Sequence, residues 1–468
     1  MIPMAERIAQ MAWMVTPATM AAWLTSGAWV PARHLMLMGR EAAVTTARAG
    51  RLAIMAPPRH GKSELISRWL PVWFLARHPD RRVVLASYGA DYATTLGRRV
   101  RDTLLTYADM LGVQVAGDSA AASRWETTEG GGMIATGADG PLTGRGADLL
   151  IIDDPIKSWD EAQSPQIRDR TWDWWTGTAL PRLEPWASVV IVMTRWHEDD
   201  LLGRILTADK GRGKGRGKEA WQVITLPALA EAKDPLGREP GEALWPERYP
   251  VETLERVHQD VGSLVWDAEY QQHPSSQAGN MFRREWFHYY DLVGGVAHME
   301  DHAWPVSQCL RFATADLAIS TRASADWTVV ATWDVTPDGD LLCVDITRAQ
   351  LEGPDVLHLI TSVVDRLHPA WVGIEDTAWQ AYAVQELVRR GLPVHGMHAD
   401  RDKLTRALAA SARYEAGRIW HPRTASWLRE YEDELLAFPR GAHDDQVDVV
   451  AYAVRQQMVP RQPDKVCA

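Results

Sequence analysis

Four short, continuously apolar runs stand out in the first half of the chain. None alternates polar with apolar positions, and they read RLAIMAP from residue 51, RRVVLASY from residue 81, ADLLIIDD from residue 147 and SVVIVMTR from residue 188. Runs of this kind are typical of strands that are buried on both faces. Because longer helical patterns separate them, residues 51–229 predict a mostly parallel α/β sheet.

The second half of the chain has a different pattern. Three apolar runs, RFATADLAI, TVVATWDV and DLLCVDIT, follow one another, and a Pro-Asp-Gly turn at residues 337–339 joins the last two as an antiparallel hairpin. Helices near residues 355–367 and 381–390 then alternate with the strands AWVGIED and LPVHGM, and further helices follow. This order predicts a mixed sheet with flanking helices, whose first three strands are antiparallel.

The change of pattern predicts two domains, and 468 residues are enough to give each a large core. We expect a first domain over residues 1–270, a linker over residues 271–305, a second domain over residues 306–458 and a flexible tail over residues 459–468. The linker expectation depends on QQHPSSQAGN, which begins at residue 271 and is rich in turn-forming and polar residues.

Composition narrows the class of protein. Hydrophobic residues make up 46% and charged residues 24%, which is globular composition, and 50 basic against 61 acidic residues give a net charge of −11. A nucleic-acid-binding surface must therefore be a local patch. The three cysteines, Cys309, Cys343 and Cys467, form no C-x-x-C pair, so we expect a reducing compartment, the cytoplasm. Polar residues, proline and glycine interrupt the uncharged run at residues 8–30, so we expect no membrane segment.

A Gly-Lys-Ser sequence follows the first apolar run. The stretch RLAIMAPPRHGKS leads from a strand into a turn and places Gly61, Lys62 and Ser63 at the start of a helix. In such a loop, backbone N–H groups surround a phosphate, the lysine supplies a positive charge and the hydroxyl ligates Mg²⁺. Ala56 replaces the first glycine of the usual pattern, so a chance Gly-Lys-Ser helix start is the alternative.

Polar residues also end two of the neighbouring strands. Asp153 and Asp154 follow LLII, at the carboxyl edge where open α/β sheets bind ligands. We expect Asp153 to hold Mg²⁺ through water and Asp154 to polarise the attacking water, although most such ATPases have the longer glutamate there. Thr194 and Arg195 end the fourth run, where they can sense a γ-phosphate. For Arg195 the alternative is a surface salt bridge.

A second group of carboxylates lies in the second half. One interrupts a strand, one ends a strand and three begin a helix, and they are Asp316, Glu375, Asp444, Asp445 and Asp448. A carboxylate inside a strand is costly without a compensating cation. Such a set suits two Mg²⁺ or Mn²⁺ ions about 4 Å apart. In phosphodiester cleavage, such ions activate the attacking water and stabilise the leaving oxygen. The alternatives are a structural carboxylate at Asp316, Asp376 in place of Glu375, and favourable charge at a helix N-terminus for the last three.

Five segments resemble a known family in their order and sequence. They are PPRHGKSE, LLIIDDP, VMTRWHEDDL, AEYQQHP and GAHDDQVD, and together they closely resemble the large terminase subunit of tailed bacteriophages or related prophages, over roughly residues 50–455. The resemblance implies an N-terminal P-loop ATPase that drives DNA into a preformed capsid and a C-terminal ribonuclease H-like nuclease that cuts the concatemer. It implies ATP and Mg²⁺, with Mn²⁺ as an alternative at the nuclease site.

The resemblance also implies partners and a location. The partners are double-stranded DNA, the small terminase subunit and the portal of the procapsid. The chain is expected to form a homo-oligomeric ring, a pentamer, while packaging in the host cytoplasm, with a monomer in solution as the alternative.

Residue roles carry over by position. His60, Gly61, Lys62 and Ser63 match the phosphate loop, and Arg59 matches an arginine that many members carry inside it. The remaining matches are the Walker B pair Asp153 and Asp154, the coupling residue Thr194, the nuclease acids Asp316, Glu375 and Asp445 with Asp448 as a fourth, and, loosely, Arg145 as an arginine that reaches a neighbouring subunit.

Two rival functions fit the sequence less well. A repair or restriction helicase-nuclease lacks support, because no second helicase core is recognisable. A DNA-binding assembly protein with decayed sites is disfavoured by the intact Lys62, Asp153, Asp316 and Asp445. The basic segment KGRGKGRGK, residues 210–218, is either a solvated loop or a loop that follows DNA phosphates.

Overall fold

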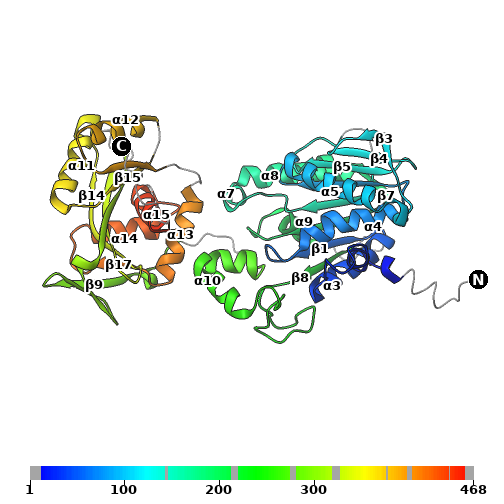
Figure 1. The fold of residues 1–468 in the computed structure, drawn as a ribbon, viewed down its shortest axis with the longest axis horizontal. Coiled ribbons are helices and arrows are strands. Elements are labelled where there is room, and N and C mark those ends of the chain that lie inside the picture. Colours follow the sequence, from blue (N-terminus) through cyan, green and yellow to red (C-terminus); the bar gives the residue numbers. More distant parts are fainter. Residues whose placement is uncertain are drawn as a thin grey trace, which may run out of the picture. The chain divides into compact units, whose positions relative to one another are not determined.

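The computed structural model describes residues 12–142, 146–211, 220–274, 281–318, 327–375, 378–397, 403–441 and 443–458. The chain divides into two compact units. The first comprises Met1–Arg256 with Leu264–Ser276, and the second comprises Val257–Ser263 with Gln277–Ala468. Each unit contains a β-sheet flanked by helices (Figure 1).

The sheet of the first unit has the strand order β3-β4-β5-β2-β6-β7-β1-β8. All neighbours from β5 to β8 in this order run parallel, and only β3 and β4 at one edge are antiparallel. This confirms the predicted mostly parallel sheet. Its strands are β1 (Arg51–Met55), β2 (Arg82–Ser87), β3 (Val115–Ala120), β4 (Arg124–Thr127), β5 (Gly132–Gly137), β6 (Ala147–Asp153), β7 (Leu183–Met193) and β8 (Trp221–Thr225).

Helices cover both faces of this sheet, which explains the unbroken apolar runs. In β1, Leu52 and Ile54 pack into one core with α2, α3, α4 and α5, whereas Ala53 and Met55 pack into another with α8, η3 and α9. Alternate residues of a strand point to opposite faces, so both sets must be apolar. The bounds of these helices are α2 (Pro17–Leu24), α3 (Arg33–Ala47), α4 (Leu70–Arg77), α5 (Ala90–Thr106), α8 (Pro165–Trp174), η3 (Trp175–Ala179) and α9 (Leu201–Gly211).

Shorter helical segments connect these elements. They are η1 (Ala12–Met14), η2 (Glu64–Trp69), α6 (Ala108–Leu111), α7 (Trp159–Gln163), η4 (Leu180–Arg182) and η5 (Trp266–Tyr270). The longer helix α10 (Val251–Val265) precedes η5, and its residues 257–263 are assigned to the second unit. Among the described helices, none is long and apolar enough to cross a lipid bilayer.

The sheet of the second unit has the order β11-β10-β9-β17-β14-β13-β12-β15-β16. As predicted, β12, β13 and β14 are antiparallel, and β15 and β16 continue in parallel from β12. The strands are β9 (His288–Val293), β10 (Val296–His298), β11 (Ala303–Pro305), β12 (Leu310–Asp316), β13 (Thr328–Val335), β14 (Leu341–Ala349), β15 (Val372–Glu375), β16 (Val394–Met397) and β17 (Ile419–Pro422).

Two layers of helices cover this sheet as well. One core contains residues of α13, α14 and α15, and a second core, on the other face, contains residues of α11 and α12. The helical segments of this unit are η6 (Arg284–Trp286), η7 (Val306–Gln308), α11 (Gly353–Leu367), α12 (Ala378–Arg389), α13 (Lys403–Glu415), α14 (Leu428–Ala437) and α15 (Asp445–Met458).

The region expected to be a linker, residues 271–305, differs from that expectation. Its second part carries β9, β10 and β11, and β9 pairs in parallel with β17. Two of these strands have only three residues, which is too short for an alternating pattern to be recognised. Residues 271–274 belong to the first unit, whereas residues 275–280 and the expected tail at 459–468 lie outside the described residues.

Candidate functional site

The phosphate-loop sequence forms a tight turn between β1 and η2. Arg59 and Gly61 have φ angles of +62° and +81°, in the left-handed region that glycine tolerates best. The ring of His60 is buried, and its Nδ1–H donates to the carbonyl oxygen of Pro58 at 2.8 Å. His34 donates from Nε2 to the carbonyl oxygen of His60, also at 2.8 Å. Burial lowers the pKa of His60 to about 4, so the ring is neutral and stabilises the turn through these contacts.

The structure brings three of the predicted site residues together at the carboxyl ends of the strands. Lys62 Nζ donates to Thr194 Oγ1 at 2.6 Å and lies 3.1 Å from Asp154 Oδ2. Asp154 Oδ1 in turn accepts from the backbone N–H of Thr194 at 2.6 Å. Lys62 is buried, and in this arrangement its charge is neutralised by Asp154. The lysine, the end of β6 and the end of β7 are therefore linked directly.

Asp153 forms a second link with the loop. Its carboxylate accepts from Ser63 Oγ at 2.9 Å and from Ser67 Oγ at 2.6 Å. Burial raises the pKa of Asp153, and the charge of Asp154 raises it further. A hydroxyl and a carboxylate are ligands that Mg²⁺ prefers, so Ser63 and Asp153 fit that ion. Ser67 was not predicted, although its spacing of four residues from Ser63 places it one helical turn further along the same face.

Arg195 does not form the surface salt bridge considered as its alternative. It is buried, and its Nε donates to Asp200 Oδ2 at 2.5 Å. The backbone N–H of Arg195 also lies 3.4 Å from Gln272 Oε1. The pair therefore fixes the chain immediately after Thr194.

The motif AEYQQHP contributes a residue that sequence reasoning missed. It runs through η5, where the carbonyl oxygen of Tyr270 accepts from Ala228 at 2.7 Å and the Gln271 side chain binds both backbone groups of Leu229, at 3.0 and 3.1 Å. The carboxylate of Glu269 has no hydrogen-bonding or ion-pairing partner within the described part of the chain. Burial raises its pKa to about 8, while Lys62 lowers and Asp154 raises it. The motif was recognisable, but nothing local indicates that Glu269 faces the phosphate-loop lysine.

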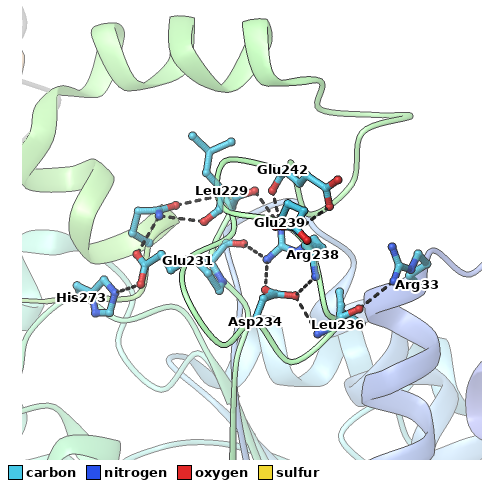
Figure 2. Close-up of polar contacts among 12 residues, drawn as sticks. Arg33, Leu229, Glu231, Asp234, Leu236, Arg238, Glu239, Glu242 and His273 are labelled. Carbon is cyan, nitrogen blue, oxygen red and sulfur yellow. Dashed lines mark hydrogen bonds and ion pairs between the residues drawn. The ribbon is translucent and has the colours of Figure 1, made fainter.

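Figure 2 shows how the segment after β8 is held. Arg238 donates to Asp234 Oδ2 at 2.6 Å, His273 lies 2.8 Å from Glu231, and Arg33 donates to the carbonyl oxygen of Leu236 at 2.9 Å. A cavity of about 450 Å³ lies beside this segment, between Arg33 and α10. No phosphate-loop residue lines it, so the phosphate chemistry lies outside this cavity.

In the second unit, the predicted acids come from three elements. Asp316 ends β12, Glu375 ends β15, and Asp445 and Asp448 lie in the first turn of α15. Thr314 Oγ1 donates to the carbonyl oxygen of Val449 at 2.8 Å, which fixes β12 against α15. Alternate residues of a strand share a face, so Asp316 lies on the same face of β12 as Thr314, against the helix that carries the other two aspartates.

Two cations from α13 hold this acidic cluster, and neither was predicted. Lys403 Nζ lies 2.6 Å from both Asp444 Oδ1 and Asp448 Oδ2. Arg406 lies 3.0 Å from both Glu375 Oε1 and Asp448 Oδ1. Nothing local in the sequence could relate these basic residues to acids about 40 positions away.

Asp316 is the exception among these acids. It has no ion pair within the described part of the chain, and burial raises its pKa well above the usual value. The charges of Asp448, Asp445 and Glu375 raise the pKa further, whereas the charge of Lys403 lowers it. Carboxylate oxygens are the right donors for Mg²⁺ or Mn²⁺. In the part of the chain that the structure describes, however, no three acidic, histidine or cysteine side chains are arranged to hold one ion. The cluster is assembled, but its ligand shell is not preformed.

Four remaining predictions are not decided by this geometry. Arg59 is exposed at the loop. Arg145, Asp376 and residues 212–218 of the basic segment lie outside the described residues.

Two family models match this chain, one in its N-terminal part and one in its C-terminal part. Residues 53–289 match the family model "Terminase large subunit, T4likevirus-type, N-terminal", and residues 313–456 match "Terminase RNaseH-like domain". No curated protein sequence matches the chain. The large terminase from the thermophilic bacteriophage D6E (crystal form 2) is similar at 12% identity and a TM-score of 0.51, over 90% of this chain and 97% of that chain.

The D6E large terminase in complex with ADP has the same coverage and identity, with a TM-score of 0.50. At this identity the likeness concerns the fold. The first family model alone spans just over half of the sequence, and the second covers most of the remainder. The chain therefore belongs to the large terminase family, with a terminase ATPase-like N-terminal unit and a ribonuclease H-like C-terminal unit.

Proposed function

We propose that this protein is an ATP-driven motor that moves double-stranded viral DNA into a preformed capsid, and a metal-dependent endonuclease that cuts concatemeric DNA. The observation that carries this proposal is the joining of Lys62, Thr194 and Asp154 at one sheet edge, in a chain that also assembles the acidic cluster of a ribonuclease H-like sheet. Two separate phosphate chemistries then belong to one chain.

For ATP hydrolysis, the residues of the first unit take distinct roles. Lys62 binds the β- and γ-phosphates, Ser63 and Asp153 hold Mg²⁺, and Asp154 orients the attacking water. Lys62 must exchange Thr194 and Asp154 for the phosphates when nucleotide binds. This exchange releases Thr194 at the end of β7, and loss of the γ-phosphate restores the contact. The gain and loss of one hydrogen bond thereby couples the nucleotide to the sheet.

For DNA cutting, the acidic cluster would hold Mg²⁺ or Mn²⁺. The ligands would be Asp316, Glu375 and Asp445, with Asp444 and Asp448 as further donors. When bound, the ions supply an activated water and stabilise the leaving oxygen. The carboxylates would hold these ions, and α15 fixes the positions of the helical aspartates.

The proposal also includes specific partner proteins. They are the small terminase subunit, the portal of the procapsid and further copies of this chain in a pentameric ring in the host cytoplasm. Within the ring, Arg59 would act on the nucleotide of its own subunit and Arg145 on that of a neighbour. Mixing Arg145→Ala with Lys62→Ala protein should then restore part of the ATPase activity, because each supplies the residue that the other lacks. Absence of rescue in assembled rings would contradict the role of Arg145.

The proposed function is tested by separating the two activities in the full chain. Lys62→Ala should reduce ATP turnover at least about 100-fold, because a charge-assisted phosphate contact is lost, and should leave metal-dependent plasmid cutting unchanged. Asp316→Ala should abolish cutting and leave ATP turnover unchanged. The matched controls are the exposed residues Lys157→Ala and Asp365→Ala, which should affect neither activity.

Three results would contradict the proposal. Near-normal ATP turnover by the Lys62→Ala protein would remove the phosphate-loop assignment. Absence of both activities in the unaltered protein would favour a decayed assembly protein. Duplex unwinding by the purified chain would favour a helicase-nuclease.

A further inference from the structure

One helix places two cations inside the acidic cluster of the second unit. Lys403 begins α13 and Arg406 follows three residues later, so both lie on the same face of the helix. Between them they make four contacts of 2.6 to 3.0 Å with Glu375, Asp444 and Asp448. The carboxylate of Asp448 is shared by both cations.

The contacts of Arg406 are buried in the fold, whereas the side chains of Lys403 and Asp444 are 32% and 45% exposed. The exposed fraction of the side chain is 6% for Asp448, 14% for Glu375 and 11% for Arg406. The guanidinium of Arg406 also lies 5.1 Å above the ring of Tyr452, an α15 residue. Carboxylates buried to this extent require compensation, and in this arrangement the cations of α13 supply it.

The same carboxylate oxygens are the ones that divalent ions would need. Mg²⁺ and Mn²⁺ bind carboxylate oxygens, and Oε1 of Glu375 and both oxygens of Asp448 are already in contact with Arg406 or Lys403. Asp316, in contrast, has no such counter-cation in direct contact among the described residues, which leaves it ready for an ion. A divalent ion brought close to an ammonium group also experiences electrostatic repulsion.

We propose that Lys403 and Arg406 are positioning residues that stand in for the metal ions, and that Lys403 must release Asp444 and Asp448 before the nuclease site can load. This inference rests on the proposed nuclease function. Lys403 is the exchangeable member, because its side chain is 32% exposed at the first residue of α13, whereas Arg406 is held against Tyr452. The pair keeps the cluster assembled without metal and lowers its affinity for metal.

The test measures, by calorimetry, the binding of Mn²⁺ to full-length variants. Only the binding heat that is absent from the Asp316→Ala protein is assigned to the nuclease site. Lys403→Met removes the charge and keeps the length of the side chain, so it should bind Mn²⁺ about tenfold more tightly than the unaltered protein. Lys403→Arg keeps the charge and should bind as the unaltered protein does. The matched control is Arg366→Met, which breaks an ion pair with Asp345 elsewhere in the same unit and should leave the affinity unchanged.

Thermal unfolding supplies a readout that does not depend on activity. In EDTA, Lys403→Met should melt below the unaltered protein, and saturating Mn²⁺ should remove the difference. Should the variant fail to fold in EDTA, the unaltered protein still decides the matter by nitrogen-15 NMR of its lysine ammonium groups. The slowly exchanging signal of Lys403 should be lost on addition of Mg²⁺.

The outcomes separate this inference from the proposed function. Unchanged or weaker Mn²⁺ binding by Lys403→Met, or a Lys403 signal that persists with Mg²⁺, would overturn the inference and leave the nuclease function standing. Metal binding that tightens as expected in a protein that cuts no DNA would contradict the nuclease function alone.

Discussion

At the scale of single residues, Glu269 predicts an unusual dependence of stability on pH. Its carboxyl has an ordinary pKa of 4.5 in the unfolded chain and about 8 in the folded chain, because it is largely buried. The folded chain therefore binds more protons between these values, and stability decreases as pH rises through this window. Glu269→Gln should add roughly 2–4 kcal/mol to the free energy of unfolding at pH 8 and little at pH 5.

Urea denaturation of the first unit at both pH values measures this effect. The exposed residue Glu255 provides the control, and Glu255→Gln should change stability equally little at pH 5 and pH 8. A Glu269→Gln protein with the same gain at both values would show that the carboxyl is ionised normally.

His60 predicts the opposite trend at lower pH. Burial lowers its pKa from 6.5 to about 4, so the unfolded chain takes up a proton before the folded chain does. Stability of the first unit should then decrease as pH falls from about 6.5 to 4. His60→Gln should make the unfolding free energy less sensitive to pH in that range, as measured by urea denaturation, and an unchanged pH profile would contradict the assignment. Gln keeps a donor for the carbonyl oxygen of Pro58.

At the scale of elements, the packing of α15 against β12 and α13 gives neighbouring aspartates opposite effects on stability. Burial and the surrounding acids destabilise the charged form of Asp316, whereas both cations of α13 stabilise that of Asp448. In EDTA at pH 8, Asp316→Asn should raise the melting temperature of the second unit by at least about 2 °C. Asp448→Asn should lower it by about 5 °C, because it leaves two cations without a shared partner.

Differential scanning calorimetry distinguishes these changes, and both variants should lose DNA cutting. The measurement of stability is decisive because activity alone would not separate a metal ligand from an anchoring residue. A stabilising Asp448→Asn substitution would show that the ion pairs of α13 are not needed to hold the cluster.

At the scale of the whole molecule, the two compact units should unfold in two transitions. Each unit has its own sheet and its own apolar cores, and the two proposed ligand sites lie in different units. Mg²⁺ with ADP should raise the melting temperature of the first unit only. At a ligand concentration of 100 times the dissociation constant, the free energy of unfolding should increase by about 2.7 kcal/mol. Mn²⁺ without nucleotide should raise the melting temperature of the second unit. Calorimetry of the full chain, with Lys62→Ala and Asp316→Ala as controls, would contradict this division if both ligands moved one shared transition.

Several properties followed from the sequence alone because they depend on neighbours along the chain. The four apolar runs predicted a sheet covered on both faces, and the Pro-Asp-Gly turn predicted the β13–β14 hairpin. Gly61-Lys62-Ser63, Asp153-Asp154 and Thr194 were recognisable because each directly follows an apolar strand. In a parallel sheet the carboxyl ends of the strands share one edge, so local position was enough to predict that these residues meet.

Tertiary structure decided what no local pattern contains. It placed Glu269 near Lys62, it brought Lys403 and Arg406 into the acidic cluster, and it extended the second sheet with residues 288–305. The contacts of α13 join residues 31 to 45 positions apart, and charge type alone does not reveal which acid meets which base. Strands of three residues carry no readable period. Strand pairing and burial arise only when the whole chain is folded. They determine which residues of distant segments come into contact.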